Sequence, residues 1–187
     1  MRIISGRSKG RKIYEPKDLN TRPLKDLTKE SIFNILTHSN KFVIKLKNSN
    51  VLDLFSGVGS FGLECLSRET SNVTFVENYD NVLPVLKKNI LDLDYQENSL
   101  VIENDIFNNL DLIIFKKKFD IIFMDPPYKE KKITTLLNKI IQSDILSNDG
   151  IIIIHRHKKE TDKFPERFNI IEEKTYGISK VIFGNYL

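Results

Sequence analysis

The sequence predicts an α/β fold built on a parallel, doubly wound sheet. From residue 51 onward, short apolar runs alternate with amphipathic segments, which is the pattern of βαβ units. The run at 151–154 is four isoleucines without polar alternation, so we expect a strand buried on both faces. A glycine-rich turn follows the first of these strands, as in α/β domains that bind nucleosides or dinucleotides. These observations predict an α/β domain with an adenosine-type ligand.

The individual elements follow from local patterns. Two β-prone runs, 2–4 and 12–14, flank a basic loop with two glycines and predict a hairpin. Residues 25–37 carry apolar side chains at helical spacing, and we expect Lys29 and Glu30 to face outward. The predicted strands are 51–55, 73–77, 100–103, 119–124 and 151–154, and the predicted helices are 59–68, 82–91 and 133–142. The runs 168–175 and 180–183 predict a closing antiparallel hairpin at the sheet edge.

Length and composition favour one domain without a membrane segment. The chain has 187 residues, 40% of them hydrophobic, which is enough for about one ordinary core. No segment approaches the roughly 20 apolar residues of a membrane span, and no apolar signal segment stands at the N-terminus. The single Cys65 excludes an intramolecular disulfide, and we expect it in the core. The histidines at 38, 155 and 157 are too scattered for a metal site, and we assign them no catalytic role. We expect a cytoplasmic monomer without a metal.

Positive charge is concentrated at the N-terminus. Residues 1–25 contain eight basic and two acidic side chains and sum to +6, whereas residues 26–187 contain 21 basic and 23 acidic side chains and sum to −2. This asymmetry indicates a polyanionic partner, although a solvated, lysine-rich edge would give the same count. We therefore divide the chain into a basic N-terminal hairpin arm, residues 1–25, and an α/β domain, residues 26–187.

The glycine-rich turn matches G-x-G-x-x-G at residues 57–62. Glu77 ends the next strand about 20 residues later, where a carboxylate can accept hydrogen bonds from both ribose hydroxyls. NAD and S-adenosylmethionine both fit this pair. Asp53 favours the second, because a carboxylate near the turn could reach an ammonium group but would repel a pyrophosphate. Asp105 is a candidate acceptor for the adenine amino group, with Ile106 packing on the ring, although an ordinary loop-start aspartate explains Asp105 nearly as well.

The tetrapeptide Asp125-Pro126-Pro127-Tyr128 indicates methyl transfer to a planar nitrogen. An exocyclic amine on a nucleobase or an amide has a delocalised lone pair, so it must be held and polarised. The Asp125 carboxylate and the Pro126 carbonyl can each accept one hydrogen bond from an NH2 group, and Tyr128 can stack on the ring. Two prolines with fixed φ and no N–H make the loop stiff, which is the preorganisation that electrostatic catalysis requires. A proline turn that closes a strand is the alternative interpretation.

These motifs recur, in order, in one bacterial family. The segments 1–12, 20–23, 51–59, 105–107, 125–128 and 176–177, together with Glu77, resemble the 16S ribosomal RNA guanine-N2 methyltransferases of the RsmD family over essentially the full length. The resemblance implies a class I, Rossmann-like methyltransferase with a seven-stranded, mostly parallel sheet and an N-terminal β-hairpin extension. It also implies S-adenosylmethionine as cofactor and, as substrate, a guanine of the small ribosomal subunit or its 16S rRNA.

The resemblance and the motif positions together give the expected site. The catalytic residues that would hold the guanine are Asp125, Pro126, Pro127 and Tyr128. The expected cofactor-binding residues are Asp53, Phe55, Ser56, Gly57, Gly59, Glu77, Asn78, Asp105, Ile106 and Arg22, the last of which could instead contact an RNA phosphate or stabilise the hairpin. The expected RNA-binding residues, which would grip phosphates around the target, are Arg2, Arg7, Lys9, Arg11 and Lys12.

The chain departs from the family pattern at two places. The family often has Ala-Gly-Ser-Gly at residues 56–59 and a glycine at Glu69 or Thr70.

Three other functions share parts of these motifs. They are an adenine-N6 methyltransferase acting on DNA or RNA, a protein glutamine methyltransferase, and a non-catalytic RNA-binding subunit. Adenine enzymes commonly carry a large target-recognition region, for which this chain has no obvious room. Glutamine enzymes usually have asparagine at the first motif position and a helical N-terminal domain.

Overall fold

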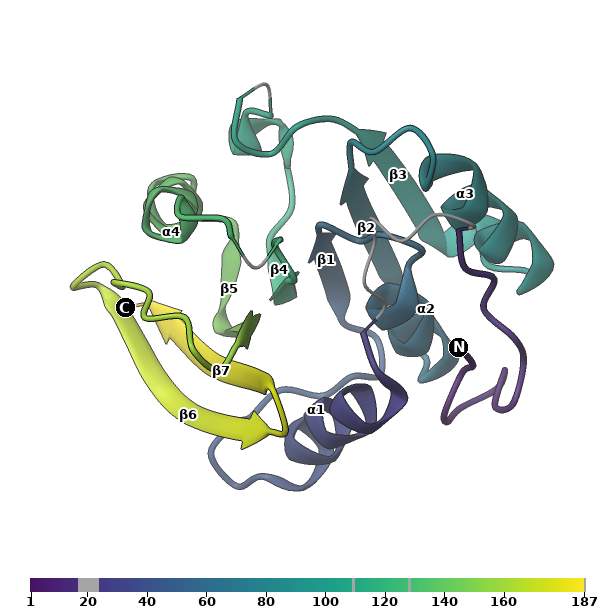
Figure 1. The fold of residues 1–187 in the computed structure, drawn as a ribbon, viewed down its shortest axis with the longest axis horizontal. Helices are drawn as coiled ribbons and strands as arrows, with labels where there is room; N and C mark the ends of the chain where they lie inside the picture. The colour runs from purple at the N-terminus through teal and green to yellow at the C-terminus, as the bar shows by residue number, and fades with distance from the viewer. Residues whose placement is uncertain (17–23, 109, 128, 187) are drawn as a thin grey trace.

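A seven-stranded sheet forms the centre of the computed structural model, which describes residues 1–16, 24–108, 110–127 and 129–186. The strands are β1 (Asn50–Leu54), β2 (Asn72–Glu77), β3 (Ser99–Glu103), β4 (Phe119–Met124), β5 (Leu146–His157), β6 (Phe168–Tyr176) and β7 (Ser179–Tyr186). Their spatial order is β3-β2-β1-β4-β5-β7-β6 (Figure 1). The first five strands are parallel, β7 is antiparallel to β5, and β6 is antiparallel to β7. The predicted seven-stranded, mostly parallel sheet is confirmed.

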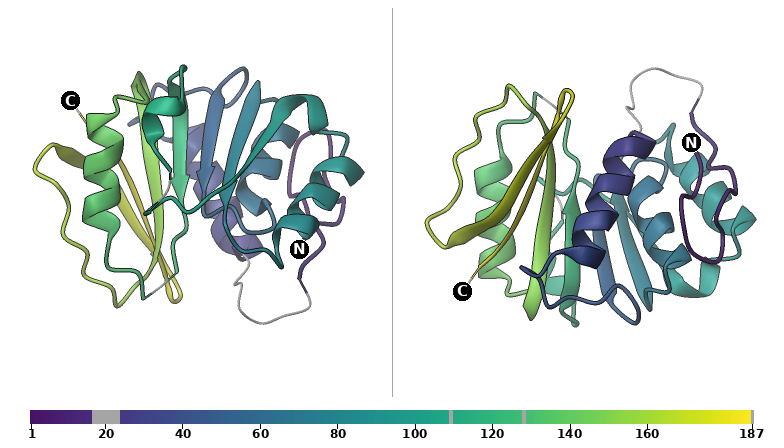
Figure 2. Two further views of the ribbon diagram at one scale, coloured as in Figure 1. Left: turned by 90° about the horizontal axis from the view of Figure 1, so that it is seen from above. Right: turned by 90° about the horizontal axis from the view of Figure 1, so that it is seen from below.

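Helices cover both faces of the sheet. They are α1 (Asp26–His38), α2 (Ser60–Ser67), α3 (Leu83–Asp92) and α4 (Ile133–Gln142), with short 3-10 helices η1 (Gln96–Asn98) and η2 (Leu112–Ile114). Side chains alternate along β1, so Val51 packs in the core under α1, α2 and α3, whereas Leu52 and Leu54 pack in the core under α4. Figure 2 shows α4 on one side of the sheet and α1 and α2 on the other. Because the strands are parallel, the ends of β1, β2 and β3 lie at one edge (Figure 1).

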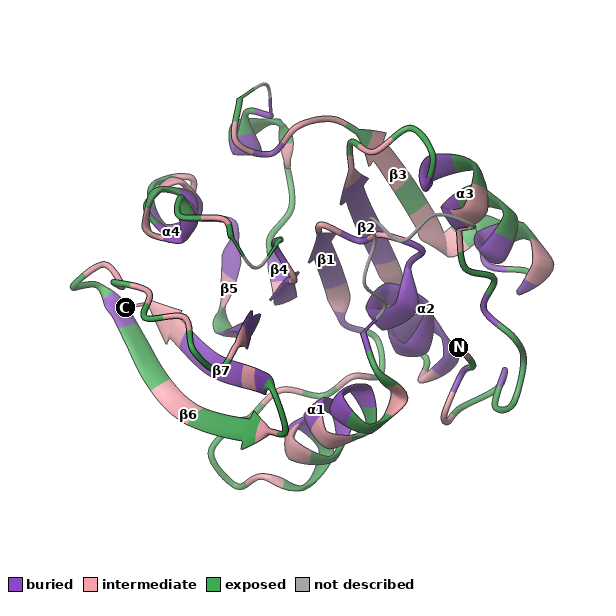
Figure 3. Ribbon diagram, viewed as in Figure 1, coloured by how far each residue is buried: buried purple, intermediate pink, exposed green. Residues whose placement is uncertain are grey.

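The C-terminal hairpin and β5 refine the predicted boundaries. Strands β6 and β7 form the expected antiparallel hairpin, and β6 is mostly exposed, as an edge strand should be (Figure 3). Strand β5 begins at Leu146, five residues before the isoleucine run, because Phe119 pairs with Leu146 ahead of a register shift. The intervening residues 147–150 have the composition of a loop, so local sequence could not reveal this extension.

The runs around Arg2 and Lys12 pair as the predicted short hairpin, and residues 1–16 pack against α2 and α3. A single antiparallel bridge joins Arg2 to Lys12. Ile3 and Ile13 are fully buried in the same core cluster as α1 and α2. The carboxylate of Glu64, fully buried in α2, accepts hydrogen bonds from the backbone N–H groups of Ile4 at 2.7 Å and Ser5 at 3.0 Å. Residues 17–23 lie outside the described part, so the domain division at residue 25 stays a prediction.

Lys29 is buried, so the prediction that it faces outward is wrong. Its side chain is 0% exposed, its Nζ donates to the Arg2 carbonyl at 2.8 Å, and Glu64 Oε2 lies 3.8 Å away. Burial lowers the pKa of Lys29, and the attraction of Glu64 offsets part of that effect. Helical spacing cannot identify a partner on another helix, which is why the sequence did not show this pair.

Candidate active site

The turn between β1 and α2 has an unusual backbone. Phe55, Gly57 and Gly59 have φ of 62°, 54° and 85°, in the left-handed region that side chains other than glycine rarely adopt. At Gly59 an added Cβ would lie 2.6 Å from a methyl carbon of Leu86. The N–H and hydroxyl of Ser56 both donate to the Val76 carbonyl, at 3.1 and 3.0 Å, which ties the turn to β2. The strain at Phe55 is typical of a functional site.

Glu77, at the end of β2, holds this turn from the other side. Its Oε2 accepts a hydrogen bond from the Gly57 N–H at 2.7 Å, and its Oε1 accepts from the N–H groups of Asn78 and Tyr79, each at 2.9 Å. A carboxylate has about four lone-pair sites. Backbone donors therefore use most of the acceptor capacity of Glu77 and fix the direction of its carboxylate.

Asp53 lies buried beneath the turn. Its side chain is 1% exposed, and its Oδ2 accepts a hydrogen bond from the Gly62 N–H at 2.9 Å. Its Oδ1 has no hydrogen-bond donor among the described residues. Burial raises the pKa of Asp53 well above its usual range; the Gly62 hydrogen bond lowers it, and repulsion from Asp125 and Glu77 raises it further. This arrangement disfavours the carboxylate unless a cation or a donor approaches.

A cavity of about 210 Å³ opens beside the ends of β2 and β3. Its lining consists of Phe55, Val76, Glu77, Asn78, Asn104, Asp105, Ile106, Phe107, Pro127 and Glu130. We define the methyl-transfer loop as residues 125–130. Five predicted cofactor residues therefore line the cavity together with two residues of this loop, Pro127 and Glu130. Sequence reasoning missed Phe107, whose ring centroid lies 5.5 Å from that of Phe55. Ser56, Gly57 and Gly59, which form the turn, and Asp53, which lies beneath it, are not among the residues that line the cavity.

Asp105 shapes its own loop as well as lining the cavity. Its Oδ1 accepts from the N–H groups of Phe107 at 2.8 Å and Asn108 at 3.2 Å, and its Oδ2 accepts from the Asn108 side-chain amide at 2.9 Å. Burial acts to raise the pKa of Asp105, but these hydrogen bonds outweigh it and leave the pKa lowered. Asp105 is therefore a loop-start aspartate that also lines the cavity, and its contact with a ligand stays a prediction.

The methyl-transfer loop begins where β4 ends. The Asp125 N–H donates to the Leu54 carbonyl at 3.4 Å, and the Asp125 side chain is 19% exposed. His155 Nδ1, on β5, lies 2.8 Å from Asp125 Oδ1. The Pro127 carbonyl accepts from the Glu130 N–H at 2.9 Å and from the Arg156 guanidinium at 3.2 Å. The predicted site residues Tyr128 and Arg22 lie outside the described residues.

The tip of the basic N-terminal segment lies at the far end of α2 from the glycine turn. The N–H of Arg7 donates to the carbonyl of Ser67, the last residue of α2, at 2.8 Å. The Arg7 guanidinium lies 4.3 Å from the Tyr95 ring centroid, and Arg11 pairs with Asp94 at 3.5 Å. An eight-residue helix is roughly 12 Å long. The basic tip and the glycine turn are therefore separated by about the length of α2.

The other basic side chains lie along the same segment. Lys12 Nζ is 5.2 Å from the Tyr14 ring centroid, and Lys88 Nζ, on α3, is 4.8 Å from the same centroid. Arg2 is 3.7 Å from an Asp26 carboxylate oxygen, and Lys9 is exposed. Contact of these residues with RNA stays a prediction.

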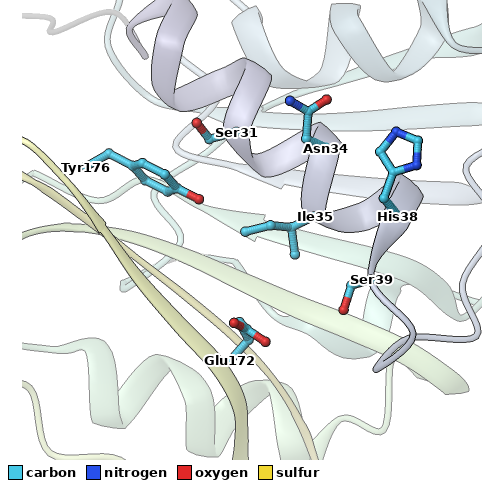
Figure 4. Close-up of a pocket in the computed structure, with 7 residues that line it drawn as sticks. All are labelled: Ser31, Asn34, Ile35, His38, Ser39, Glu172 and Tyr176. Carbon is cyan, nitrogen blue, oxygen red and sulfur yellow. The ribbon is translucent and has the colours of Figure 1, made fainter.

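A second, larger hollow of about 550 Å³ lies between α1 and β6 (Figure 4). Its lining residues are Ser31, Asn34, Ile35, His38, Ser39, Glu172 and Tyr176. The Glu172 carboxylate is already paired with Lys41 and with Lys174, whose Nζ lies 2.9 Å away. The smaller cavity is the candidate active site, because it alone of the two adjoins the strand ends, the glycine turn and the methyl-transfer loop.

Neither a metal cluster nor a membrane-spanning helix is present in the part of the chain that the structure describes. No three histidine, cysteine, aspartate or glutamate side chains in the described ranges are grouped so that they could hold a metal ion. None of the described helices has the length and apolar character needed to cross a membrane.

Comparisons with known proteins place the chain in a family. The family model described as "Conserved hypothetical protein 95" matches residues 1–185. The Bacillus subtilis protein named "Putative rRNA methyltransferase YlbH" is 34% identical over 185 residues, covering 97% of this chain and 96% of the relative. Ribosomal RNA small subunit methyltransferase D of Haemophilus influenzae is 32% identical over 179 residues, covering 95% of this chain and 90% of the relative.

A solved structure agrees over the whole chain. An Escherichia coli protein described as a putative methyltransferase is 26% identical, with a TM-score of 0.81, and the match covers 100% of this chain and 97% of that one. The matched region includes the glycine turn, the cavity and the methyl-transfer loop. The chain therefore belongs to the "Conserved hypothetical protein 95" family, the RsmD family of methyltransferases that its motifs resemble.

Proposed function

We propose that this protein transfers a methyl group from S-adenosylmethionine to the exocyclic N2 amine of a guanine in small-subunit 16S ribosomal RNA. The observation that carries the proposal is the shared cavity, because Glu77 and Asp105 line it together with Pro127 of the methyl-transfer loop. Family membership and the rRNA methyltransferase names of the curated relatives support the substrate class.

The residues present fit S-adenosylmethionine better than a dinucleotide. The buried Oδ1 of Asp53 has no donor among the described residues, and the Asp125 and Glu77 carboxylates raise the pKa of Asp53. A ligand with an ammonium group would relieve this repulsion, whereas a pyrophosphate would add to it. Glu77 would hold the ribose, and Asp105 and Ile106 would meet the adenine. When bound, this cofactor supplies an electrophilic methyl group on a sulfonium.

The methyl-transfer loop supplies orientation rather than strong base catalysis. Asp125 and the Pro126 carbonyl would each accept one hydrogen from the guanine NH2 group, which aligns its lone pair for attack. Asp125 would then help the proton leave. Alignment of this kind can lower a barrier by roughly 7–11 kcal/mol. Because the edge of the base must enter the site, the guanine would be unpaired or flipped, and Tyr128 would stack on it. The proposed enzyme acts as a cytoplasmic monomer on the ribosomal subunit or its RNA.

Transfer of labelled methyl groups tests the proposal directly. The protein is incubated with S-adenosylmethionine and, in parallel, with unmodified small ribosomal subunits, naked ribosomal RNA, duplex DNA and a release factor. We expect label only in the two RNA samples, recovered as N2-methylguanosine after nucleoside digestion. Label in N6-methyladenine or methylglutamine would keep the mechanism but refute the substrate. Cofactor binding without transfer to any sample would favour the non-catalytic RNA-binding function.

A further inference from the structure

We infer that the end of β5 positions the methyl-transfer loop through two neighbouring side chains, His155 and Arg156. Their contacts leave Asp125 Oδ2 and the Pro126 carbonyl as the acceptors for the target amine. β5 lies beside β4 in parallel register, with Ile154 opposite Met124. Residues 155 and 156 therefore stand next to the point where the loop leaves β4. The inference rests on the proposed function, because it concerns how the loop meets an amine.

His155 holds one oxygen of the Asp125 carboxylate. The His155 side chain is 7% exposed, and its Nδ1 lies 2.8 Å from Asp125 Oδ1. The carboxylate can only accept, so the contact places the imidazole proton on Nδ1. Among the described residues no donor reaches Asp125 Oδ2, and the Asp125 side chain is partly exposed. One oxygen is thus fixed by the protein, while no described donor occupies the other.

Arg156 holds the backbone of the same loop. Its side chain is 0% exposed, and it donates to the Pro127 carbonyl at 3.2 Å and to the Glu130 carbonyl at 2.9 Å. Its Nε and second nitrogen pair with the two Asp162 oxygens at 2.9 and 3.0 Å. Such a paired fork is a rigid and directional contact. Arg156 therefore fixes both ends of the turn that the Glu130 N–H closes on Pro127.

Together the two contacts select the acceptors. An NH2 group has two hydrogens and needs two acceptors in fixed positions. His155 occupies Asp125 Oδ1 and Arg156 occupies the Pro127 carbonyl, while no described donor reaches the Pro126 carbonyl. Pro127 and Glu130 also line the cofactor cavity, so Arg156 links the shape of the cavity to the position of the loop. Sites held by packed neighbours in this way are the ones that keep catalytic geometry.

Substitution of His155 tests the first contact. His155→Asn keeps an N–H donor close to the Nδ1 position, whereas His155→Leu removes it. We expect His155→Leu to lower kcat on the order of 10- to 100-fold, as a misplaced catalytic group would. Affinity for S-adenosylhomocysteine and KM for RNA should stay within about 2-fold, and His155→Asn should recover most of kcat. Wild-type kcat in His155→Leu, or equal losses in both variants, would overturn the role of His155.

Substitution of Arg156 tests the second contact. Arg156→Lys keeps the charge but cannot form the fork, so we expect a lower kcat together with weaker S-adenosylhomocysteine binding. Arg68→Lys is the matched control, because Arg68 also pairs with a buried carboxylate, Glu64 at 2.9 Å, but on α2. The control should lose thermal stability without changing kcat. An unchanged Arg156→Lys, or an equal loss of kcat in the control, would contradict the role of Arg156.

A spectroscopic measurement separates this inference from the proposed function. The chain has three histidines, so nitrogen-15 spectra of labelled imidazoles are simple, and His155→Asn identifies the His155 signals. We expect His155 to be protonated on Nδ1 and its signals to shift in Asp125→Ala. Unshifted signals would refute the His155–Asp125 contact even in an active enzyme. If wild type transfers no methyl group, the proposed function fails while this spectrum still decides whether the contact exists.

Discussion

Replacing Asp53 by asparagine should stabilise the protein without cofactor and reduce the stabilisation that S-adenosylmethionine provides. Asp53 is 1% exposed, and one of its oxygens has no donor among the described residues. Asparagine has nearly the same shape and no charge, and its carbonyl oxygen can still accept the Gly62 hydrogen bond. The amide NH2 that replaces Oδ1 also lacks a partner among the described residues, so the gain comes from removing the buried charge, because an unsatisfied charged group costs more than a neutral one. We expect a net gain on the order of 1–3 kcal/mol at neutral pH. For a chain of this length that corresponds to a rise in Tm of roughly 2–12 °C.

The sign of the pH dependence follows from the raised pKa of Asp53 in the folded state. The folded protein retains the proton where the unfolded chain, with a carboxyl pKa of about 3.9, has lost it. The stability that the neutral carboxyl contributes is therefore complete below about pH 3.9 and is lost as the pH rises toward the folded-state value. An asparagine side chain does not titrate, so the advantage of Asp53→Asn should be small in acid and should grow as the pH rises.

Urea unfolding followed by circular dichroism, from about pH 4 to about pH 8, gives the free energy of unfolding of wild type and of Asp53→Asn. Asp120→Asn is the matched control, because the Asp120 oxygens accept from the Asn50 N–H at 2.8 Å and the Ser147 hydroxyl at 2.9 Å. Losing a satisfied carboxylate should destabilise that control. The reasoning is refuted if Asp53→Asn is less stable than wild type at neutral pH, or if the difference does not change with pH.

The same samples test the cofactor. At a concentration 100 times Kd a ligand stabilises the folded state by about 2.7 kcal/mol, and tenfold weaker binding reduces this to about 1.4 kcal/mol. We expect S-adenosylmethionine to stabilise wild type more than Asp53→Asn, because only the carboxylate attracts its ammonium group. If S-adenosylmethionine stabilised wild type and Asp53→Asn equally, Asp53 would not contact the cofactor.

Three further predictions concern catalysis, RNA binding and backbone strain. Asp125→Ala should lower the rate of methyl transfer on the order of 100-fold or more, while its affinity for S-adenosylhomocysteine, measured by calorimetry, stays within about 2-fold of wild type. Near-full turnover would contradict the catalytic role of the methyl-transfer loop. The double variant Lys9→Gln, Lys12→Gln should weaken RNA binding and lower the slope of log K against log salt by about 1 per lysine. The control double variant Lys45→Gln, Lys116→Gln, at two exposed lysines, should leave the slope unchanged. Equal slopes in the two double variants would reject the N-terminal contact with RNA. Glu69→Gly should raise the free energy of unfolding by about 1 kcal/mol, since Glu69 has φ of 68° just after α2; a loss of stability in urea would show that the ion pair with Lys47, 3.1 Å away, outweighs the strain.

Much of the fold was predictable, because the local pattern of apolar residues indicates most of the helices and strands. β4 and α4 begin and end at the predicted residues, and the four-isoleucine run is fully inside the sheet. The resemblance led us to expect a glycine at Glu69 or Thr70, and Glu69 has the left-handed φ of 68° that favours glycine. The buried Lys29–Glu64 pair and the early start of β5 depend on partners far away in the sequence, so no window of neighbouring residues could predict them.

Parts of the candidate site were also predictable from the sequence, whereas other parts depend on contacts between distant segments. Glu77 ends β2, and Asp105 lies just after the end of the neighbouring parallel strand β3. Such strand ends meet at one edge of the sheet, which is consistent with the cavity that these two residues share with Pro127. The contacts of His155 and Arg156 require β5 to lie next to β4 in a particular register, which the sequence did not specify. The sequence analysis did not predict Phe107 as a site residue, because an aromatic residue in a loop belongs to no periodic pattern of apolar residues.

The distribution of charge explains how an acidic site can act on a polyanion. Asp53, Glu77 and Asp125 lie close enough that the last two raise the pKa of the first, so this edge of the sheet repels phosphate. The basic tip at Arg7 lies at the opposite end of α2. Under the proposed function, the RNA backbone would be attracted at a distance from the site, and only an uncharged base would enter it. A flipped guanine meets this requirement, because its exocyclic amine can reach Asp125 while its phosphates stay outside the acidic edge.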